Sequence, residues 1–335
     1  MAIDQPQLVM YCFLMKHSVN LQDLKYKRGA VVVAAGGHLE QALRRVYQLE
    51  IDKNVTFFVP RNSQSESKLQ NIQHSYISNV RSRDLKGLFK ASLQLLTLIR
   101  KKELDFVLST GAGVAIACRL VCKFKGIDFI YIESIARQFS PSMTGKVLQA
   151  MRTKNLFSES KKFDSTKWRS IDSLFSEYYQ DDNLISENNS HSLKIFVTLG
   201  TVHQYEFPRL VELVNSIIKP DDQLVWQIGN LKDMNLQGEV FKELTHLDFV
   251  TYLNVSDVVI SHAGVGSVLS ILDSGKFPIL IPRLAEHGEH IDNHQLEIAS
   301  VVSNLNLCTV ITDKLLRTDL MQARLKQIKI RRRIN

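Results

Sequence analysis

DVVISHAGVGS, residues 257–267, is the stretch that decides the predicted fold of this 335-residue chain. It begins with a short apolar run of β-branched residues, and residues 265–272 return to helical spacing, so the glycines fall at a turn from strand to helix. Gly264 and Gly266 let the backbone approach a phosphate, and the following helix offers unpaired N–H groups and the positive end of its dipole. The turn therefore suits a diphosphate. A plain tight turn of an α/β sheet is the alternative, because Gly-x-Gly alone is a weak signal.

A second short strand, residues 277–282 (FPILIP), ends in proline just before a loop rich in histidine and carboxylate. Ligands of open α/β sheets bind at the carboxyl ends of the strands, so this polar loop has a reason to be exposed. The spacing of His287, His290 and His294 would suit a zinc site on one helix face. We predict no metal, because the same mixture of amide, carboxylate and imidazole groups hydrogen-bonds the hydroxyls of a sugar.

Length and composition allow two domains with buried cores, since 44% of the residues are hydrophobic. Four scattered cysteines, Cys12, Cys118, Cys122 and Cys308, do not make a disulfide framework, so we expect reduced core residues and a cytosolic compartment. No stretch reaches the roughly 18 to 20 apolar residues that a spanning helix needs. The chain is expected to be soluble or peripheral to a membrane.

Positive charge is concentrated in the first half of the chain. Residues 1–180 carry 27 Lys and Arg against 15 Asp and Glu, a net charge of +12, and the remainder carries −4, within a total of +8. No nucleic-acid motif accompanies these charges, so we predict no nucleic-acid partner. Residues 85–103 (LKGLFKASLQLLTLIRKKE) place leucines and a phenylalanine between clusters of Lys and Arg, which is typical of an interfacial helix. A helix that simply faces the core is the alternative. The predicted partner of the basic half is an anionic membrane surface.

Alternating strands and helices indicate two similar α/β domains. Residues 28–35 (RGAVVVAA) form an expected buried strand that leads into Gly36-Gly37-His38 and a helix over 39–49, and the pattern restarts with a strand at 195–199 that opens on Gly200-Thr201. Further strands are expected at 55–59, 106–109, 129–132 and 224–228, and a further helix at 207–218. The predicted organisation is an extension outside the first core (1–28), a first Rossmann-like domain (29–178), a polar linker (179–193) and a second Rossmann-like domain (194–335).

Short motifs recur in order along both halves. They are residues 36–39 (GGHL), 109–115 (STGAGVA), 131–137 (YIESIAR) and 140–146 (SPSMTGK), then 197–201 (VTLGT), 261–267 and 288–299. The first set resembles the acceptor-binding subunit of the two-subunit bacterial capsule and exopolysaccharide glycosyltransferases, and the second set resembles their donor-binding subunit. The same pair is related to the two-subunit N-acetylglucosaminyltransferase of the dolichol pathway. The chain looks like a fusion of both subunits.

The resemblance implies an α/β GT-B fold, in which two Rossmann-like domains face a central cleft. It also implies an inverting transfer of a sugar from a UDP-sugar to a polyprenyl-diphosphate-linked saccharide, in capsule or exopolysaccharide assembly. The enzyme would be peripheral on the cytoplasmic face of the membrane. UDP-sugar is then the donor substrate, and no cofactor or metal is expected.

Three groups of site residues follow from the resemblance and the chemistry. His38 is the predicted base for the acceptor hydroxyl, because an imidazole titrates near neutral pH, although a helix-start residue bonded to the backbone is its alternative role. Glu133 is a second candidate, with a buried carboxylate paired to Arg137 as the alternative. The predicted donor-binding residues are Gly200, Thr201, His262, Ala263, Gly264, Gly266, Ser267, Glu289, His290, Asp292, His294 and Gln295. The predicted acceptor-binding residues are Gly36, Gly37, Thr110, Gly111, Gly113 and Arg137.

One position departs from the family pattern. Relatives carry a glutamate in the helix after the glycine turn, where a carboxylate can accept both ribose hydroxyls, and this chain has Ser270 there. Three explanations are open. The protein binds the ribose more weakly, Asp273 binds the ribose hydroxyls in place of the glutamate, or the nucleotide is not UDP. Two other functions remain open: a non-catalytic nucleotide-binding scaffold of the same assembly, and an epimerase of free UDP-sugars. The sequence does not identify the sugar, the acceptor or the oligomeric state.

Overall fold

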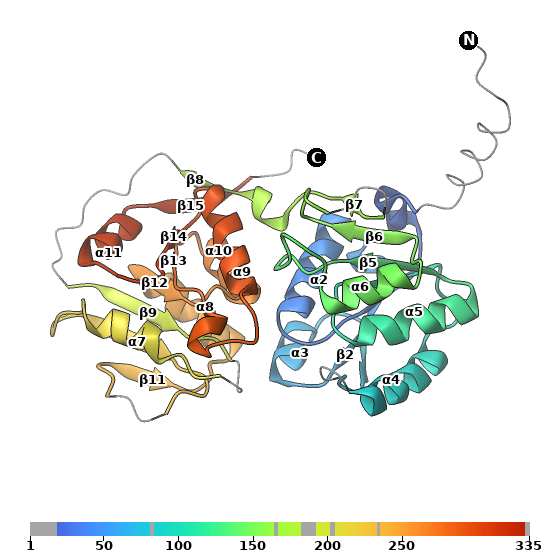
Figure 1. Cartoon of the computed structure of the whole chain (residues 1–335), viewed down its shortest axis with the longest axis horizontal. Helices are drawn as coiled ribbons and strands as arrows, with labels where there is room; N and C mark the ends of the chain where they lie inside the picture. The colour runs from blue at the N-terminus through green and yellow to red at the C-terminus, as the bar shows by residue number, and fades with distance from the viewer. Residues whose placement is uncertain are drawn as a thin grey trace, which may run out of the picture. The chain divides into compact units, whose positions relative to one another are not determined.

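A computed structural model describes residues 19–80, 84–163, 167–181, 192–201, 205–232 and 235–331. The chain divides into two compact units (Figure 1). Unit 1 holds the described residues up to Ile171, except residues 66–68 and 135–139, which group with unit 2. Unit 2 holds those two short segments and everything from Asp172 onward. Each unit is an α/β layer structure with its own parallel sheet.

Unit 1 contains a seven-stranded parallel sheet in the order β3-β2-β1-β4-β5-β6-β7. Its strands are β1 (Gly29–Val32), β2 (Val55–Pro60), β3 (His74–Ile77), β4 (Phe106–Ser109), β5 (Asp128–Ile132), β6 (Asn155–Ser158) and β7 (Arg169–Ser170). Its helices are α2 (Gly37–Gln48), α3 (Ser63–Lys68), α4 (Leu85–Leu98), α5 (Val114–Lys125) and α6 (Met143–Ala150), with short 3-10 turns η1 (Leu21–Tyr26) and η2 (Asp52–Asn54). The four strands predicted here are confirmed, and the order is that of a doubly wound sheet.

Alternate residues of the central strands face opposite layers of helices. Ala30 and Val32 of β1 pack in one core with residues of α4, α5 and α6, whereas Val31 and Val33 pack in the other with residues of α2. Because both faces are covered, the strands read as continuous apolar runs, which is why sequence alone could place them. Cys118 and Cys122 are buried in α5 as free thiols, as expected.

The prediction that residues 1–28 lie outside the first core is wrong for the described part, residues 19–28. Val19 and Leu24 are buried among the core residues that contact α2. The backbone N–H of Val19 also donates to Asn155 Oδ1 at 3.2 Å. The apolar side chains of this segment are too few to show periodicity, so only their contacts identify them as core.

Helix α4 has one side that faces the core and another side that exposes apolar residues. Ala91 and Leu95 are buried against the core, whereas Leu85, Phe89 and Leu93 are 78%, 67% and 50% exposed. The helix ends at Leu98, and the basic residues that follow lie in a turn. In the described part of the chain, no helix is both long and apolar enough to cross a bilayer.

Unit 2 contains a six-stranded parallel sheet in the order β11-β10-β9-β12-β13-β14. Its strands are β9 (Lys194–Thr198), β10 (Gln223–Gln227), β11 (Glu239–Phe241), β12 (Val258–Ser261), β13 (Ile279–Leu280) and β14 (Thr309–Val310). Its helices are α7 (Pro208–Asn215), α8 (His246–Val255), α9 (Val265–Asp273), α10 (His294–Asn304) and α11 (Arg317–Arg324), with 3-10 turns η3 (Leu174–Glu177) and η4 (Ala285–His287). The strand order repeats that of unit 1, so β9 corresponds to β1 and β12 to β4.

A two-stranded antiparallel ribbon closes unit 2. Strand β8 (Tyr178–Asp181) pairs with β15 (Gln327–Ile330), with Tyr178 opposite Ile330 and Asp181 opposite Gln327. The predicted linker at 179–193 therefore begins inside a strand, and the chain enters unit 2 at Asp172 rather than at 194. Residues 182–191 of that linker lie outside the described residues.

Candidate functional site

The first candidate site lies at the topological switch point of unit 1, where the loops after β1 and β4 meet. His38 stands in the first turn of α2, and its Nδ1 lies 2.9 Å from the carbonyl oxygen of Thr110. The hydroxyl of Thr110 donates in return to the carbonyl of His38 at 2.8 Å. The structure therefore brings together residues of two predicted motifs that lie 72 positions apart in sequence.

The contact with Thr110 fixes the chemistry of the His38 ring. A carbonyl can only accept, so Nδ1 carries the proton and the neutral ring has its lone pair on Nε2. Gly111 has a φ of +135°, and a Cβ there would lie 2.4 Å from Cε1 of His38. Gly111 is thus needed both for its backbone conformation and for the space that the imidazole fills.

The corresponding crevice of unit 2 lies between β9 and β12. Here the histidine follows β12, the equivalent of β4, and not the equivalent of β1. His262 follows β12, and its Nδ1 faces the carbonyl oxygen of Thr198 at the end of β9, at 3.4 Å. A Cβ at Gly200 would lie 2.5 Å from Nε2 of His262, and one at Gly264 would lie 2.3 Å from the same atom. The imidazole is therefore enclosed between two predicted glycines, and only glycine fits at either place.

Burial controls the charge of His262. Desolvation, assisted by the positive charge of Arg283, lowers the pKa of His262 to about 3. The ring is uncharged at neutral pH, so it does not act as a cation toward a phosphate. Its visible role is to shape the turn that leads into α9.

The N-terminus of α9 is open to an anion. Gly264 is its N-cap, and among the described residues no side chain caps it. A Cβ at Gly266 would meet nothing within 4 Å, so there is room above the first turn. Unpaired N–H groups and the helix dipole thus point to the space that the sequence assigned to a diphosphate.

Two predicted donor-binding residues are held by arginines that the sequence analysis did not identify. Glu289 is buried and accepts from Arg209 at 2.9 and 2.8 Å. Arg283 is also buried and donates to the carbonyls of Leu199, Tyr205, Glu206 and Glu289. The amide oxygen of Gln295 accepts from the backbone N–H of Arg283 at 3.1 Å. Glu289 and Gln295 therefore fix the shape of the loop.

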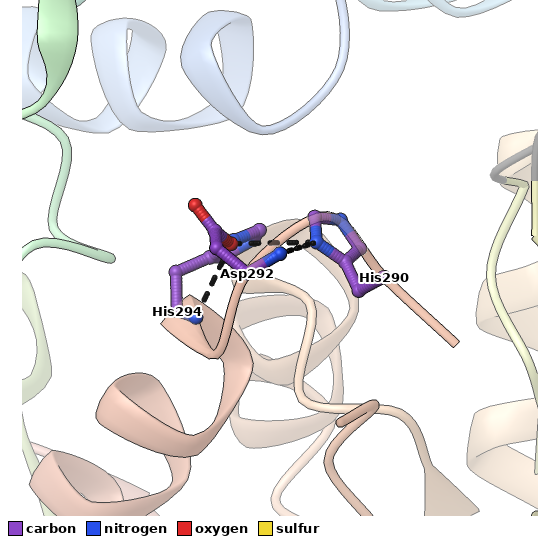
Figure 2. A group of neighbouring side chains, drawn as sticks. All are labelled: His290, Asp292 and His294. Carbon is purple, nitrogen blue, oxygen red and sulfur yellow. Dashed lines mark hydrogen bonds and ion pairs between the residues drawn. The ribbon is translucent and has the colours of Figure 1, made fainter. Parts of the chain in front are cut away.

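Three other predicted donor-binding residues of that loop gather around one carboxylate (Figure 2). Asp292 Oδ1 contacts Nδ1 of His294 closely and lies 3.4 Å from Nδ1 of His290. Its other oxygen accepts from Arg137 at 2.7 Å. Burial would raise the pKa of Asp292, but the hydrogen bonds from His294 and Arg137 outweigh it and hold that pKa well below its usual value. Asp292 is an ionised, oriented acceptor of the kind that binds sugar hydroxyls.

Glu133 is hydrogen-bonded to Tyr131, Ser134 and Ser142 and not to Arg137. Arg137 pairs with Asp292, so the alternative pairing of Glu133 with Arg137 is wrong. The carboxylate instead accepts from Tyr131, from the backbone N–H of Ser134, and from the backbone and hydroxyl of Ser142. Burial raises its pKa, and the hydrogen bonds from Ser134 and Ser142 oppose that shift. These contacts anchor the N-terminus of α6, whose N-cap is Ser142.

The position that departs from the family pattern is enclosed. Ser270 is buried in α9, and its carbonyl accepts from the hydroxyl of Ser274. Asp273, the alternative ribose ligand, accepts from the Tyr178 hydroxyl at 2.6 Å. The hydroxyl of Tyr178 therefore already occupies one oxygen of that carboxylate.

Parts of this chain are similar to known glycosyltransferases. Residues 194–329 match the Glycosyltransferase family 28 C-terminal domain. The UDP-N-acetylglucosamine transferase subunit ALG13 of Candida albicans is 40% identical over 128 residues, which are 35% of this chain and 41% of that protein. The UDP-N-acetylglucosamine–N-acetylmuramyl-(pentapeptide) pyrophosphoryl-undecaprenol N-acetylglucosamine transferase of Vesicomyosocius okutanii is 24% identical over 312 residues, covering 88% of this chain and 86% of that protein. The enzyme of the same name from Chlorobaculum tepidum is 25% identical, with 60% of its length covered.

Solved structures extend the likeness to both units. MurG of Acinetobacter baumannii superposes with a TM-score of 0.55 at 18% identity, over 88% of this chain and 89% of that one. The glycotransferase of kitacinnamycin gives a TM-score of 0.55 at 15% identity, over 89% and 90%. The predicted GT-B fold with two Rossmann-like domains is confirmed. The fold is that of the GT-B glycosyltransferases, and the part of unit 2 over residues 194–329 is similar to the family 28 C-terminal domain.

Proposed function

We propose that this chain is an inverting, metal-independent hexosyltransferase that moves a sugar from a UDP-sugar to a polyprenyl-diphosphate-linked saccharide. Two observations, one in each unit, carry the proposal: the His38 ring of unit 1 is oriented by the carbonyl of Thr110, and the N-terminus of α9 in unit 2 has no side-chain cap among the described residues. The match of residues 194–329 to a family 28 domain supports the donor side. The Vesicomyosocius okutanii relative aligns over 312 residues, and its name describes transfer from UDP-N-acetylglucosamine to a pyrophosphoryl-undecaprenol acceptor. That name supports both proposed substrate classes.

Each unit would contribute one part of the reaction. His38 Nε2 accepts the proton of the acceptor hydroxyl as that oxygen bonds to the anomeric carbon of the donor sugar. The bond from that carbon to the diphosphate breaks, and UDP leaves with the electron pair. Backbone N–H groups at α9 stabilise the negative charge that develops on UDP. Asp292 and His294 hold hydroxyls of the donor sugar.

The test is UDP release by the purified protein across a panel of UDP-sugars, with and without membranes that carry polyprenyl-linked acceptor. Release should require the membranes and favour one donor. A His38→Ala variant should lose about 10²- to 10⁴-fold in kcat, because it lacks the base. His74→Ala removes another part-buried unit 1 histidine whose Nδ1 faces a carbonyl, and it should retain activity.

Two results would contradict the proposal. UDP binding without release for any donor would favour the scaffold function. Conversion of free UDP-sugar into its epimer without acceptor would favour the epimerase.

We further propose that unit 1 binds the cytoplasmic face of an anionic membrane through α4 and α5. The exposed side chains Leu85, Phe89 and Leu93 repeat every four residues on α4, and Leu120 and Phe124 of α5 are 48% and 83% exposed. Lys86, Lys90 and Lys123 are exposed beside them. Apolar side chains flanked by lysines suit insertion between anionic headgroups. Capsule or exopolysaccharide assembly is the proposed setting, and its support is the sequence resemblance.

Vesicle sedimentation tests this membrane face. The double variant Phe89→Ser/Phe124→Ser should lose about tenfold or more in affinity for vesicles of phosphatidylcholine with phosphatidylglycerol, since two aromatic side chains no longer leave water. Tyr47→Ser is the matched control, because Tyr47 is 59% exposed on α2, which covers the opposite face of the sheet. Equal loss in both variants would count against the α4 and α5 face.

A further inference from the structure

The loop between β13 and α10 gathers three metal-ligand side chains in one place. One ligand atom each of His290, Asp292 and His294 lies within 4.8 Å of the other two. In Figure 2 Asp292 lies beside both histidines, and dashed contacts link it to each of them. Their side chains are 13%, 33% and 23% exposed, so an ion can reach them from solvent.

One pair of ligand atoms already has the spacing of a tetrahedral zinc site. Bonds of about 2.0–2.2 Å from Zn²⁺ to nitrogen and oxygen place neighbouring ligand atoms about 3.4 Å apart. His290 Nδ1 and Asp292 Oδ1 are already separated by 3.4 Å. His290 Nδ1 accepts from the backbone N–H of Asp292 at 3.4 Å, so a bound metal ion would replace this long hydrogen bond.

Neighbouring groups hold the three ligands in orientation. Arg137 donates to Asp292 Oδ2 at 2.7 Å, which leaves Oδ1 turned toward the imidazoles. The ring of Tyr205 stacks on His290 with centroids 5.7 Å apart. The rings of His290 and His294 meet edge to face at 4.4 Å. Such supporting contacts orient metal ligands in known sites and raise affinity.

We propose that His290, Asp292 and His294 form a binding site for a Zn²⁺-type metal ion, with a fourth position open to solvent. Two imidazoles and one carboxylate favour Zn²⁺ over Mg²⁺ or Ca²⁺, which prefer oxygen ligands. Bound metal occupies Asp292 Oδ1 and the ring nitrogens, so the same atoms cannot hold sugar hydroxyls. The metal is therefore an inhibitor that competes with the donor; this second step rests on the proposed function.

Zn²⁺ binding is measured directly by competition with a chromogenic chelator, and Co²⁺ serves as a spectroscopic probe through the visible absorption of a tetrahedral site. The wild-type protein should bind one ion. His290→Ala and His294→Ala should each weaken binding by more than about tenfold, and Arg137→Gln by about tenfold through the loss of orientation. His287→Ala is the matched control, because His287 is exposed in the same loop and lies outside the cluster.

The outcomes separate the two proposals. Wild-type protein that binds no ion, or binding that survives in a correctly folded His290→Ala/His294→Ala variant, overturns the metal site. A circular dichroism spectrum and thermal melt of each variant establish folding, and Asp292→Asn offers a second, nearly isosteric test. With transfer activity in hand, Zn²⁺ should raise the KM for donor and leave kcat unchanged. Metal binding without any transfer supports the site and contradicts the proposed function, whereas transfer that Zn²⁺ does not affect overturns the inhibition.

Discussion

Each unit has a histidine whose ring faces a backbone carbonyl across the crevice between its two central strands, but the histidine follows a different strand in each unit. In unit 1 the ring follows β1 and reaches the carbonyl after β4, whereas in unit 2 it follows β12 and reaches back to the end of β9. Both rings lie against a glycine with positive φ, Gly111 in one and Gly200 in the other. They differ in burial: His38 is half-buried, and His262 is 6% exposed. Equivalent crevices therefore hold one ring that solvent can reach and one ring that is enclosed.

The largest expected difference is in stability. His262→Ala should lower the free energy of unfolding by about 2–4 kcal/mol, because it leaves a cavity in a tightly packed turn. His38→Ala should cost less than about 1 kcal/mol, since its ring borders solvent. Urea unfolding of both variants gives the values. Similar losses in the two would remove the distinction between a reactive and a structural histidine.

The pH dependence of stability is the second expected difference. In the unfolded chain His262 becomes protonated below its ordinary pKa of about 6.5. In the folded protein its pKa is about 3, so the ring stays neutral to a much lower pH. Stability from this group is complete above pH 6.5 and is lost as the pH falls toward 3. Between pH 7 and pH 5 the loss should be about 2 kcal/mol.

Urea midpoints at the two pH values measure this loss in the wild type and in His262→Gln. The variant should lack this component of the pH dependence, and His74→Gln, which keeps His262, should retain it. A wild-type slope that persists in His262→Gln would assign the effect to other groups.

The smallest expected effect is at the open end of α9. Gly266→Ala should leave stability nearly unchanged, because a Cβ meets nothing within 4 Å. The added methyl would occupy space proposed for the diphosphate, so UDP affinity should fall by about tenfold, or about 1.4 kcal/mol. Calorimetric titration with UDP measures it, with Ser274→Ala at the other end of the helix as control. Unchanged affinity would place the diphosphate elsewhere.

Sequence reasoning succeeded where one segment carries its own signal. The central strands β1, β4 and β9 are buried apolar runs, and the glycines after them mark the turns. It missed the edge strands β3 and β11, which are short and partly exposed, and also the short strands β6, β7 and β14. Such strands form because a neighbour offers hydrogen bonds, and no pattern within them reports that.

The candidate site divides in the same way. The Gly-His turns and the Asp292 loop could be located from composition and resemblance. The pairing of Glu289 with Arg209 joins residues 80 positions apart, so nothing local indicates that this carboxylate is engaged. Arg283 directly follows a buried strand that ends in proline. Its position in the sequence therefore predicts a buried arginine, and a buried guanidinium needs hydrogen-bond acceptors.

The β8–β15 ribbon has a practical consequence for dissecting this protein. A fragment that starts at residue 194, where the family 28 match begins, would lack β8 and leave β15 with an open edge. Unpaired edges of this kind attract other chains and promote aggregation. A fragment from Asp172 onward keeps the ribbon closed, and it also keeps Tyr178, whose hydroxyl holds the end of α9 through Asp273. A fragment of unit 2 therefore needs residues that precede the segment matched by the family 28 domain.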